Sequence, residues 1–379
     1  MIPTLIRMRV VALVVGVVLT LATFGALVQS VLVPRGSTAW IARGVNSFVN
    51  VLNRAPLRFM KTYRAQDRWL IGAAPVSVIL QLTVYVIVLI LTMGLVVFGT
   101  SNLSLGDSLY QSGSTLTTLG IVEPVTDVSS VVCFVAAFLG LVVIAVFIGY
   151  LLAIYSSYAA RESQMERLAL LAGEPAWGPE VLARGHLLKL PGSEIPAADI
   201  WIDWICDIRM NQRVNPVLSD LRSSSPYRHW AVTMLAVTDS AALRLALQPT
   251  STDPKLVLLI AESTLAAHQL RNIDHRLHNW QIQAEVQRIL SGDANRPVNS
   301  LLTDDEWRDG VSALEEVGYV MPGELDQARE RFERIRTLYA ADVYHLTKSF
   351  HAIPAPWSGP RVPALPVMRP ERATNEVST

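Results

Sequence analysis

Three long stretches without a charged side chain constrain this chain more than any other feature of its sequence. They are residues 10–34, 69–106 and 128–160. A helix that crosses the roughly 30 Å hydrocarbon core of a bilayer needs about 20 predominantly apolar residues. Each stretch exceeds that length, so the sequence predicts an integral membrane protein with spans at Val10–Val33, Ile71–Gly99 and Val131–Tyr155.

The first stretch is interpreted as a retained span and not as a cleaved signal peptide. The apolar region of a signal peptide is about 7–15 residues long and ends at a site between small residues. Val10–Val33 is longer than this, and no clean site of that kind closes it. We therefore expect residues 1–34 to be an N-terminal membrane anchor.

The charges between the stretches predict the topology, because loops rich in Lys and Arg stay on the cytoplasmic side. Residues 35–69 carry seven basic residues and one acidic residue, whereas residues 100–130 carry three acidic residues and no basic one. The connector 35–69 is therefore expected in the cytoplasm and the acidic loop outside. It follows that the N-terminus lies outside and the chain after Tyr155 is cytoplasmic, although Arg7 and Arg9 weakly oppose this orientation.

The basic connector has its own amphipathic pattern. Apolar side chains recur at helical spacing, and Arg43 and Arg54 lie off their stripe: Trp40, Ile41, Val45, Phe48, Val49 and Leu52. Such a helix suits the headgroup layer, with its basic residues facing anionic lipid. A helix packed on the protein's own cytoplasmic domain explains the pattern equally well.

The loop between the second and third stretches is neutral and moderately apolar in its middle. A short helix is expected from Leu105 to about Thr117, and small, hydroxyl-bearing and glycine residues follow it. Non-helical backbone at membrane depth is tolerated only where it is buried in protein or lines a water-filled path. An extended segment after such a helix can replace the hydration of a cation with carbonyl and threonine oxygen atoms. We therefore expect a re-entrant pore loop over Tyr110–Pro124.

The segment from Leu109 to Gly120 resembles the pore helix and early selectivity filter of bacterial two-span potassium channels. It has an aromatic residue after leucine, a serine two positions later, and then Thr-x-Thr-Thr-aliphatic-Gly. The resemblance implies an outer helix, a re-entrant pore helix with its filter, and an inner helix, closed into a pore by a homotetramer. It also implies that Gly140 is a hinge of the inner helix, and close packing between helices is the alternative reason for a glycine there. The implied ion pathway comprises Thr117, Thr118, Leu119, Gly120, Ile121, Val122 and Glu123.

The pattern departs from that family after Gly120. Ile121 and Val122 stand where the family has an aromatic residue and a second glycine, and Glu123 stands where it usually has aspartate. A β-branched residue enters the backbone geometry of the second glycine only with strain, so strict potassium selectivity does not follow. Four Glu123 carboxylates at an outer mouth still favour cations. The alternative is a non-conducting scaffold or sensor that acts through its cytoplasmic domain.

Residues 158–352 are expected to form an all-helical cytoplasmic domain. Residues 353–379 are rich in proline and are expected to be a disordered tail. Long helical stretches are expected over 254–290 and 323–351, and Thr303 to Glu306 forms a capping box. Residues 229–247 are expected to be a buried soluble helix because they include Asp239 and Arg244. One helix carries an apolar stripe at i, i+3, i+4 and i+7, typical of a core face: Trp201, Trp204, Ile205 and Ile208.

This half of the chain lacks the motifs of several functional classes. No Gly-x-Gly-x-x-Gly follows a strand, no phosphate-binding loop is present, and no catalytic constellation stands out, so we expect neither an enzyme nor a cofactor other than permeant monovalent cations, K⁺ foremost. The net charge of zero gives no reason to expect a nucleic-acid partner. A metal site at His268, His275 and His278 is less expected than a solvated or packed face. The cytoplasmic partner is not indicated.

The cytoplasmic half is also similar to the helical tail of a family of bacterial ion-channel-like membrane proteins. The similarity covers the chain from about Val76 to Trp357, and it implies a multi-pass protein of a bacterial cytoplasmic membrane that is channel-like. It says nothing of the role of the tail. The segments that carry the similarity are Ala159–Ser163, Leu168–Gly173, Asn215–Arg222, His229–Asp239, Tyr339 and Pro354–Trp357.

Overall fold

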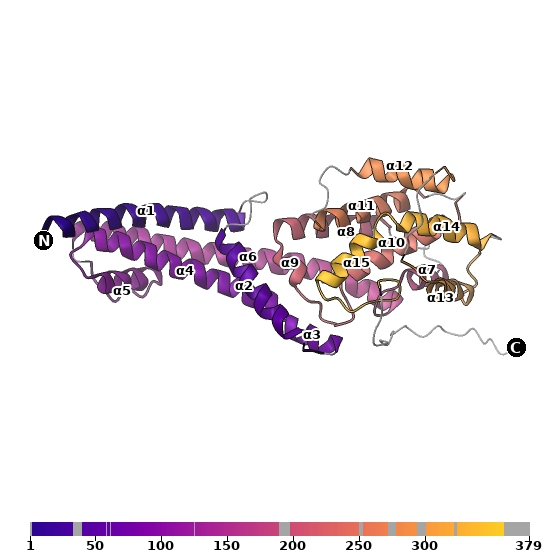
Figure 1. Cartoon of the computed structure of the whole chain (residues 1–379), viewed down its shortest axis with the longest axis horizontal. Helices are drawn as coiled ribbons and strands as arrows, with labels where there is room; N and C mark the ends of the chain where they lie inside the picture. Colours follow the sequence, from indigo (N-terminus) through magenta and orange to yellow (C-terminus); the bar gives the residue numbers. More distant parts are fainter. Residues whose placement is uncertain are drawn as a thin grey trace. The chain divides into compact units, whose positions relative to one another are not determined.

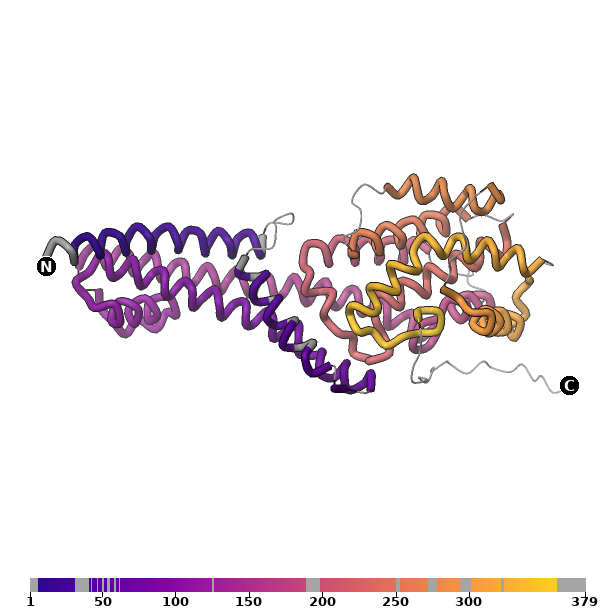
Figure 2. The backbone as a smooth tube through the Cα atoms, viewed as in Figure 1, coloured from indigo at the N-terminus to yellow at the C-terminus, as the bar shows by residue number. Residues whose placement is uncertain are grey.

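The computed structural model describes residues 2–32, 40–57, 59–60, 62–124, 126–188, 198–249, 253–271, 278–293, 301–321 and 324–359. Within these ranges every regular element is an α-helix. The chain divides into two compact units, drawn as a ribbon in Figure 1 and as a tube in Figure 2. Unit 1 is Met1–Met60 with Trp69–Ser156, and unit 2 is Lys61–Arg68 with Ser157–Thr379.

Unit 1 is a bundle of apolar helices. Its helices are α1 (Ile2–Leu32), α2 (Trp40–Leu57), α4 (Ala73–Thr100), α5 (Leu105–Leu116) and the first part of α6 (Asp127–Ala172). The helix α1 lies along α4, and α5 lies beside α4 at the end near Thr100 (Figure 1). Small residues permit the close approach of α1 and α4, as is common between membrane helices. A Cβ atom at Gly16 would lie 2.9 Å from the Val96 side chain.

Four helices in the described ranges are long and apolar enough to cross a membrane, so this is a membrane-associated protein. Three of them, α1, α4 and α6, overlap the three predicted spans, although α4 begins at Ala73 and not at Ile71. The fourth is α10 (Trp230–Leu247) of unit 2, and 94% of its apolar window is buried by the rest of the protein. The helix α6 continues past Tyr155, where the predicted span ends, because the residues that follow are mostly good helix formers.

The connector helix α2 packs within unit 1. Ile41, Val45 and Val49 are buried, and α2 contacts α4. The buried apolar face of α2 therefore packs within unit 1, to which α4 also belongs. Phe48 and Val51 are exposed on another side of α2.

Unit 2 surrounds the buried helix α10. The neighbours that contact α10 are α7 (Gly178–Leu187), α11 (Pro254–Leu270), α14 (Leu325–Arg336) and α15 (Ala340–Ser349). The other helices are α3 (Tyr63–Leu70, most of it in this unit), α8 (Ala198–Val214), α9 (Val217–Asp220), α12 (Asn279–Leu290), α13 (Asp304–Glu315) and the end of α6. The predicted tryptophan stripe of α8 is buried in this core, and the capping box at Thr303 is confirmed.

A buried ion pair joins α10 to α14 at the centre of unit 2. Arg336 and Asp239 are each 1% exposed, and Arg336 Nε lies 3.1 Å from Asp239 Oδ1. The Tyr339 hydroxyl donates a hydrogen bond to the same oxygen at 2.7 Å. Burial, followed by the charge of Asp239, raises the pKa of the Tyr339 phenol well above its usual value. Arg336 also donates to the carbonyl oxygen of Trp357.

Two predictions for the end of the chain are corrected by these contacts. The expected helix over 323–351 is wrong, because α14 ends at Arg336 and α15 begins at Ala340. The intervening turn places Tyr339 beside Asp239. The expected disorder is also wrong for residues 353–359, since Ile353 and Trp357 are buried against unit 2. The remainder of the predicted tail, residues 360–379, lies outside the described residues.

Removal of the buried guanidinium tests how much this ion pair contributes to the free energy of unfolding of unit 2. The substitution Arg336→Leu leaves Asp239 buried without its cation, so we expect the free energy of unfolding of unit 2 to fall by about 3–5 kcal/mol. The matched control is Arg334→Leu on the same helix, which removes a partly exposed pair with Glu330 and is expected to cost about 1 kcal/mol or less. Thermal unfolding followed by circular dichroism in detergent measures both, and equal losses would contradict this account.

His229 predicts a dependence of stability on pH. Burial, and next the cations Arg222 and Arg161, lower the pKa of His229 well below 6.5. The imidazole is therefore neutral in the folded protein and becomes protonated on unfolding below about pH 6.5. Because the unfolded state then binds one more proton, the free energy of unfolding is expected to fall by up to about 1.4 kcal/mol for each pH unit below 6.5.

Chemical unfolding between pH 5 and 7.5 measures this slope. The substitution His229→Asn keeps an acceptor for the Ala231 amide, which now bonds His229 Nδ1 at 3.2 Å, and is expected to flatten the slope. An identical slope in both proteins would show that another group is responsible.

Candidate functional site

The short helix α5 begins with a side-chain cap. Ser104 Oγ accepts a hydrogen bond from the Asp107 amide at 3.2 Å and donates to Asp107 Oδ2 at 2.6 Å. An acidic residue in the first turn also offsets the positive end of the helix dipole. These local signals explain why α5 begins where the sequence predicts, although its last residue is Leu116.

From this cap α5 runs back along α4. A Cβ atom at Gly94 would lie 2.5 Å from Leu109 Cδ2, and Ser112 Oγ donates to the Ile90 carbonyl at 3.0 Å. Gly94 and Ile90 precede the end of α4 at Thr100 by six and ten residues. At about 1.5 Å per residue these contacts lie roughly 9 and 15 Å from that end. The helix α5 therefore descends beside the apolar part of α4.

The end of α5 lies against α6. A Cβ atom at Gly140 would be only 2.2 Å from the Leu116 carbonyl oxygen, so a larger residue does not fit there without a shift. Gly140 is thirteen residues after the start of α6 at Asp127, which is roughly 20 Å along the helix. The end of α5 is thus near the middle of the uncharged stretch 128–160. This contact is a packing reason for glycine, and the hinge at Gly140 stays a prediction.

The segment after α5 folds back onto Ser114. The Ser114 carbonyl accepts from the Leu119 amide at 2.8 Å and from the Gly120 amide at 3.1 Å, and Ser114 Oγ accepts from the Ile121 amide at 2.9 Å. Thr118 and Gly120 have φ values of 58° and 64°. The expected extended segment is therefore wrong at these residues, because their amides satisfy acceptors at the helix end. A left-handed φ is strained for a β-branched residue such as Thr118.

The seven predicted pathway residues, 117–123, form one continuous surface segment. Leu119 is 63% exposed and Ile121 is 55% exposed. Glu123 is exposed and Val122 is half-buried. Within the described part of the chain, the carbonyl oxygens of residues 118–122 accept no hydrogen bond. These carbonyls are therefore available to water, to a cation or to another chain.

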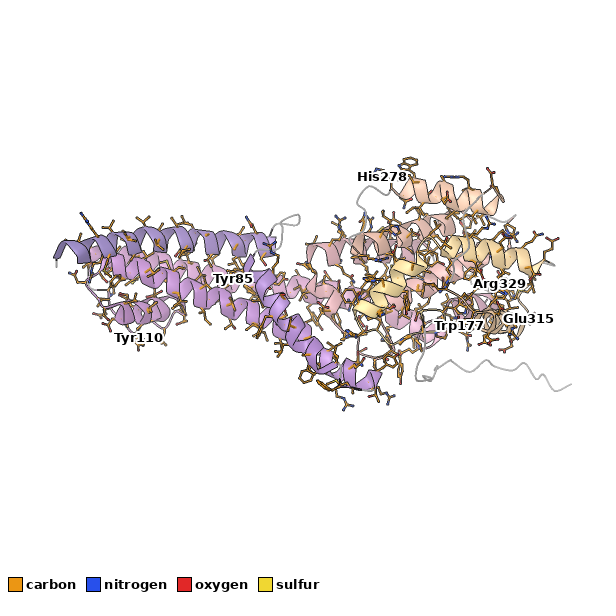
Figure 3. The ribbon with its side chains drawn as sticks, in the orientation of Figure 1. Tyr85, Tyr110, Trp177, His278, Glu315 and Arg329 are labelled. Atoms are coloured by element: carbon orange, nitrogen blue, oxygen red, sulfur yellow. The ribbon has the colours of Figure 1, made fainter. Side chains whose placement is uncertain are left out.

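Sequence reasoning missed Ser114, whose carbonyl and hydroxyl hold the segment. The only sequence signal at this position is a serine three residues before the pair Thr117 and Thr118. It also missed Gln111, which is fully buried on α5 and donates to Cys133 Sγ at 3.5 Å. Figure 3 labels Tyr110 on the same helix and Tyr85 on α4. Tyr110 is exposed, whereas Tyr85 is buried and donates to the Ala26 carbonyl at 3.2 Å.

The histidines weighed as metal ligands do not form a site in the described residues. His268 pairs with Asp342, which also accepts a hydrogen bond from Arg271 Nη1 at 2.6 Å. His278 is the N-cap residue of α12 (Figure 3), and His275 lies outside the described residues. No group of three or more potential ligands occurs within the described ranges.

Comparison of the chain with family models, with curated proteins and with solved structures finds no match. The candidate site therefore rests on the geometry of α4, α5 and α6 and on the resemblance of residues 109–120.

The contact between the end of α5 and α6 can be tested with substitutions at two glycines of α6. The substitution Gly140→Ala places a methyl group against the Leu116 carbonyl, so we expect it to destabilise unit 1 by about 1–3 kcal/mol. The substitution Gly149→Ala is the control, because a Cβ atom there meets nothing within 4 Å. Thermal unfolding in detergent measures the difference. Equal stability of the two variants would contradict the close approach.

Proposed function

We propose that four copies of this chain form a cation channel, with residues 117–123 of each copy along the ion path. The observation that carries the proposal is the contact between the end of α5 and α6. The Leu116 carbonyl, the last of α5, lies against Gly140 near the middle of the apolar part of α6. The negative end of a helix dipole at that depth favours a cation where the membrane dielectric is lowest. After Asp107 the helix carries no charged residue that would oppose this placement.

The surface of the segment supports assembly around a common axis. Each chain contributes one α5 and one segment with exposed carbonyl oxygens, so a closed path needs several copies. Four copies match the pore architecture that residues 109–120 resemble. The exposed Leu119 and Ile121 side chains would then meet neighbouring copies.

Loop charge supports an orientation for the channel. The connector 35–69 is basic and the loop 100–130 is acidic, so the connector and unit 2 lie in the cytoplasm and Glu123 faces the outside. The N-terminus is also outside in this arrangement. The membrane is the cytoplasmic membrane of a bacterial cell, and the permeant ions are monovalent cations, with K⁺ the first candidate.

One observation favours a second function. The amides of Leu119, Gly120 and Ile121 all bond to Ser114, which curls the segment instead of extending it. An extended row of carbonyls is what a potassium filter requires. A membrane scaffold or sensor that acts through unit 2, with no conduction and no enzymatic step, is therefore the alternative.

Ion flux separates these two functions. Liposomes that contain the purified protein are expected to release K⁺ along its gradient faster than protein-free liposomes. They are also expected to conduct Na⁺ measurably, because the second filter glycine is absent. The variant Glu123→Gln is expected to reduce cation flux by several-fold, since four carboxylates at the mouth raise the local cation concentration. Asp305→Asn, an exposed carboxylate on α13, is the control.

Two outcomes would contradict the channel. Absence of flux above protein-free liposomes for both ions favours the scaffold. Native mass spectrometry in detergent is expected to show four chains, and a stable monomer or dimer would exclude a four-fold path.

A further inference from the structure

A cavity of about 250 Å³ lies within unit 2, between the end of α6 and one face of α8. Ala160 and Arg161 contribute to its wall from α6, and Trp204 and Ile208 contribute from α8. Sites for drug-sized ligands enclose about 300–1,000 Å³ and combine apolar walls with a few polar groups. This cavity has the same character at a smaller size, so it suits a small molecule.

One polar group in the cavity wall has no partner. Gln212 is 4% exposed, and its Oε1 accepts a hydrogen bond from Ser219 Oγ at 3.0 Å. Its Nε2 has no hydrogen-bond partner among the described residues. A buried N–H group without an acceptor is costly, because folding removes its water and replaces it with nothing. An acceptor atom on a ligand in the cavity would complete the hydrogen bonding of Gln212.

The uncompensated charge of the cavity is negative. Asp203 and Asp207 lie one turn apart on α8, line the cavity and are exposed. Neither forms an ion pair with the described part of the chain. Arg161 also lines the cavity, but its guanidinium donates to the Leu218 carbonyl at 2.6 Å and pairs with Glu162 Oε1 at 3.0 Å. A cationic ligand therefore meets two carboxylates whose charge no side chain here neutralises.

We propose that this cavity binds a small organic cation, namely an amine with a short apolar body and a hydrogen-bond acceptor. The ammonium group lies at Asp203 and Asp207, and the apolar body packs against Trp204. The acceptor atom of the ligand accepts a hydrogen bond from Gln212 Nε2. An indole face adds attraction for the cation. Because α6 continues unbroken from unit 1 into unit 2, a ligand that joins α6 to α8 acts on the helix that also contacts α5.

Tyramine is a suitable probe, because it combines an ammonium group, an aromatic body and a phenol oxygen. We expect the purified full-length protein in detergent to bind tyramine saturably in calorimetric titration, with a Kd below about 1 mM. 4-Hydroxyphenylacetate has a similar ring and oxygen but carries a carboxylate in place of the amine. It is expected to bind at least about tenfold more weakly, because the two aspartates repel it.

Variants locate the site. The double substitution Asp203→Asn with Asp207→Asn is expected to weaken tyramine binding by about tenfold or more. The control with the same change in charge is Asp309→Asn with Asp326→Asn, two exposed carboxylates outside the cavity, and it is expected to bind as the unmodified protein does. Ala160→Phe, at an exposed lining position, is expected to abolish binding because the ring occupies the cavity.

Three results would overturn the proposal. The first is equal affinity of the cavity double variant and the unmodified protein. The second is equal binding of the anionic analogue. The third is no saturable binding of tyramine up to about 1 mM, which is the result expected if the cavity holds only water.

Discussion

The candidate site depends on one contact between two helices, the approach of the Leu116 carbonyl to Gly140. A Cβ atom at Gly140 would lie 2.2 Å from that oxygen, so only glycine permits the contact without a shift. Inside a bilayer no water satisfies a loose helix end, and a short helix that stops at membrane depth has to be held by protein. Gly140 provides the space, and Ser114 accepts the amides of the residues that follow. The contact between Leu116 and Gly140 therefore sets the level along α6 at which residues 117–123 follow α5.

The constraint on unit 2 is a buried charge. Its central helix is apolar enough to cross a membrane and yet contains Asp239. A lone carboxylate is costly in lipid and equally costly in a protein core. Here Arg336 and Tyr339 surround Asp239, and Arg336 continues the network to the Trp357 carbonyl. The helix α10 is therefore stabilised inside the protein, where these partners are available. Hydropathy alone does not distinguish the two environments, whereas the charged residues within 229–247 do.

Local signals predicted the elements of this protein well. The apolar stretches, the short helix that begins at Leu105, the capping box at Thr303 and the tryptophan stripe of α8 can be predicted because their signals lie within a few residues. At the end of the chain, predictions failed where the partner is distant in the sequence. The break before Ala340 has no strong local signal, and it places the Tyr339 hydroxyl within hydrogen-bond distance of Asp239. Residues 353–359 contain prolines typical of disorder, but Trp357 is buried and its carbonyl accepts from Arg336.

The sequence by itself determined that the chain is helical and membrane-associated, and that a short helix stands between two apolar ones. Charge, hydropathy and capping act over one or two turns, so they can be read without a structure. Only the tertiary structure decided the level along α6 at which α5 ends, the fold-back of residues 118–121 onto Ser114, and the cavity at Gln212. The position of α5 depends on atoms from residues far apart in the sequence, such as Leu116 with Gly140 and Ser112 with Ile90. Close packing between elements, and not the pattern within one, sets such contacts.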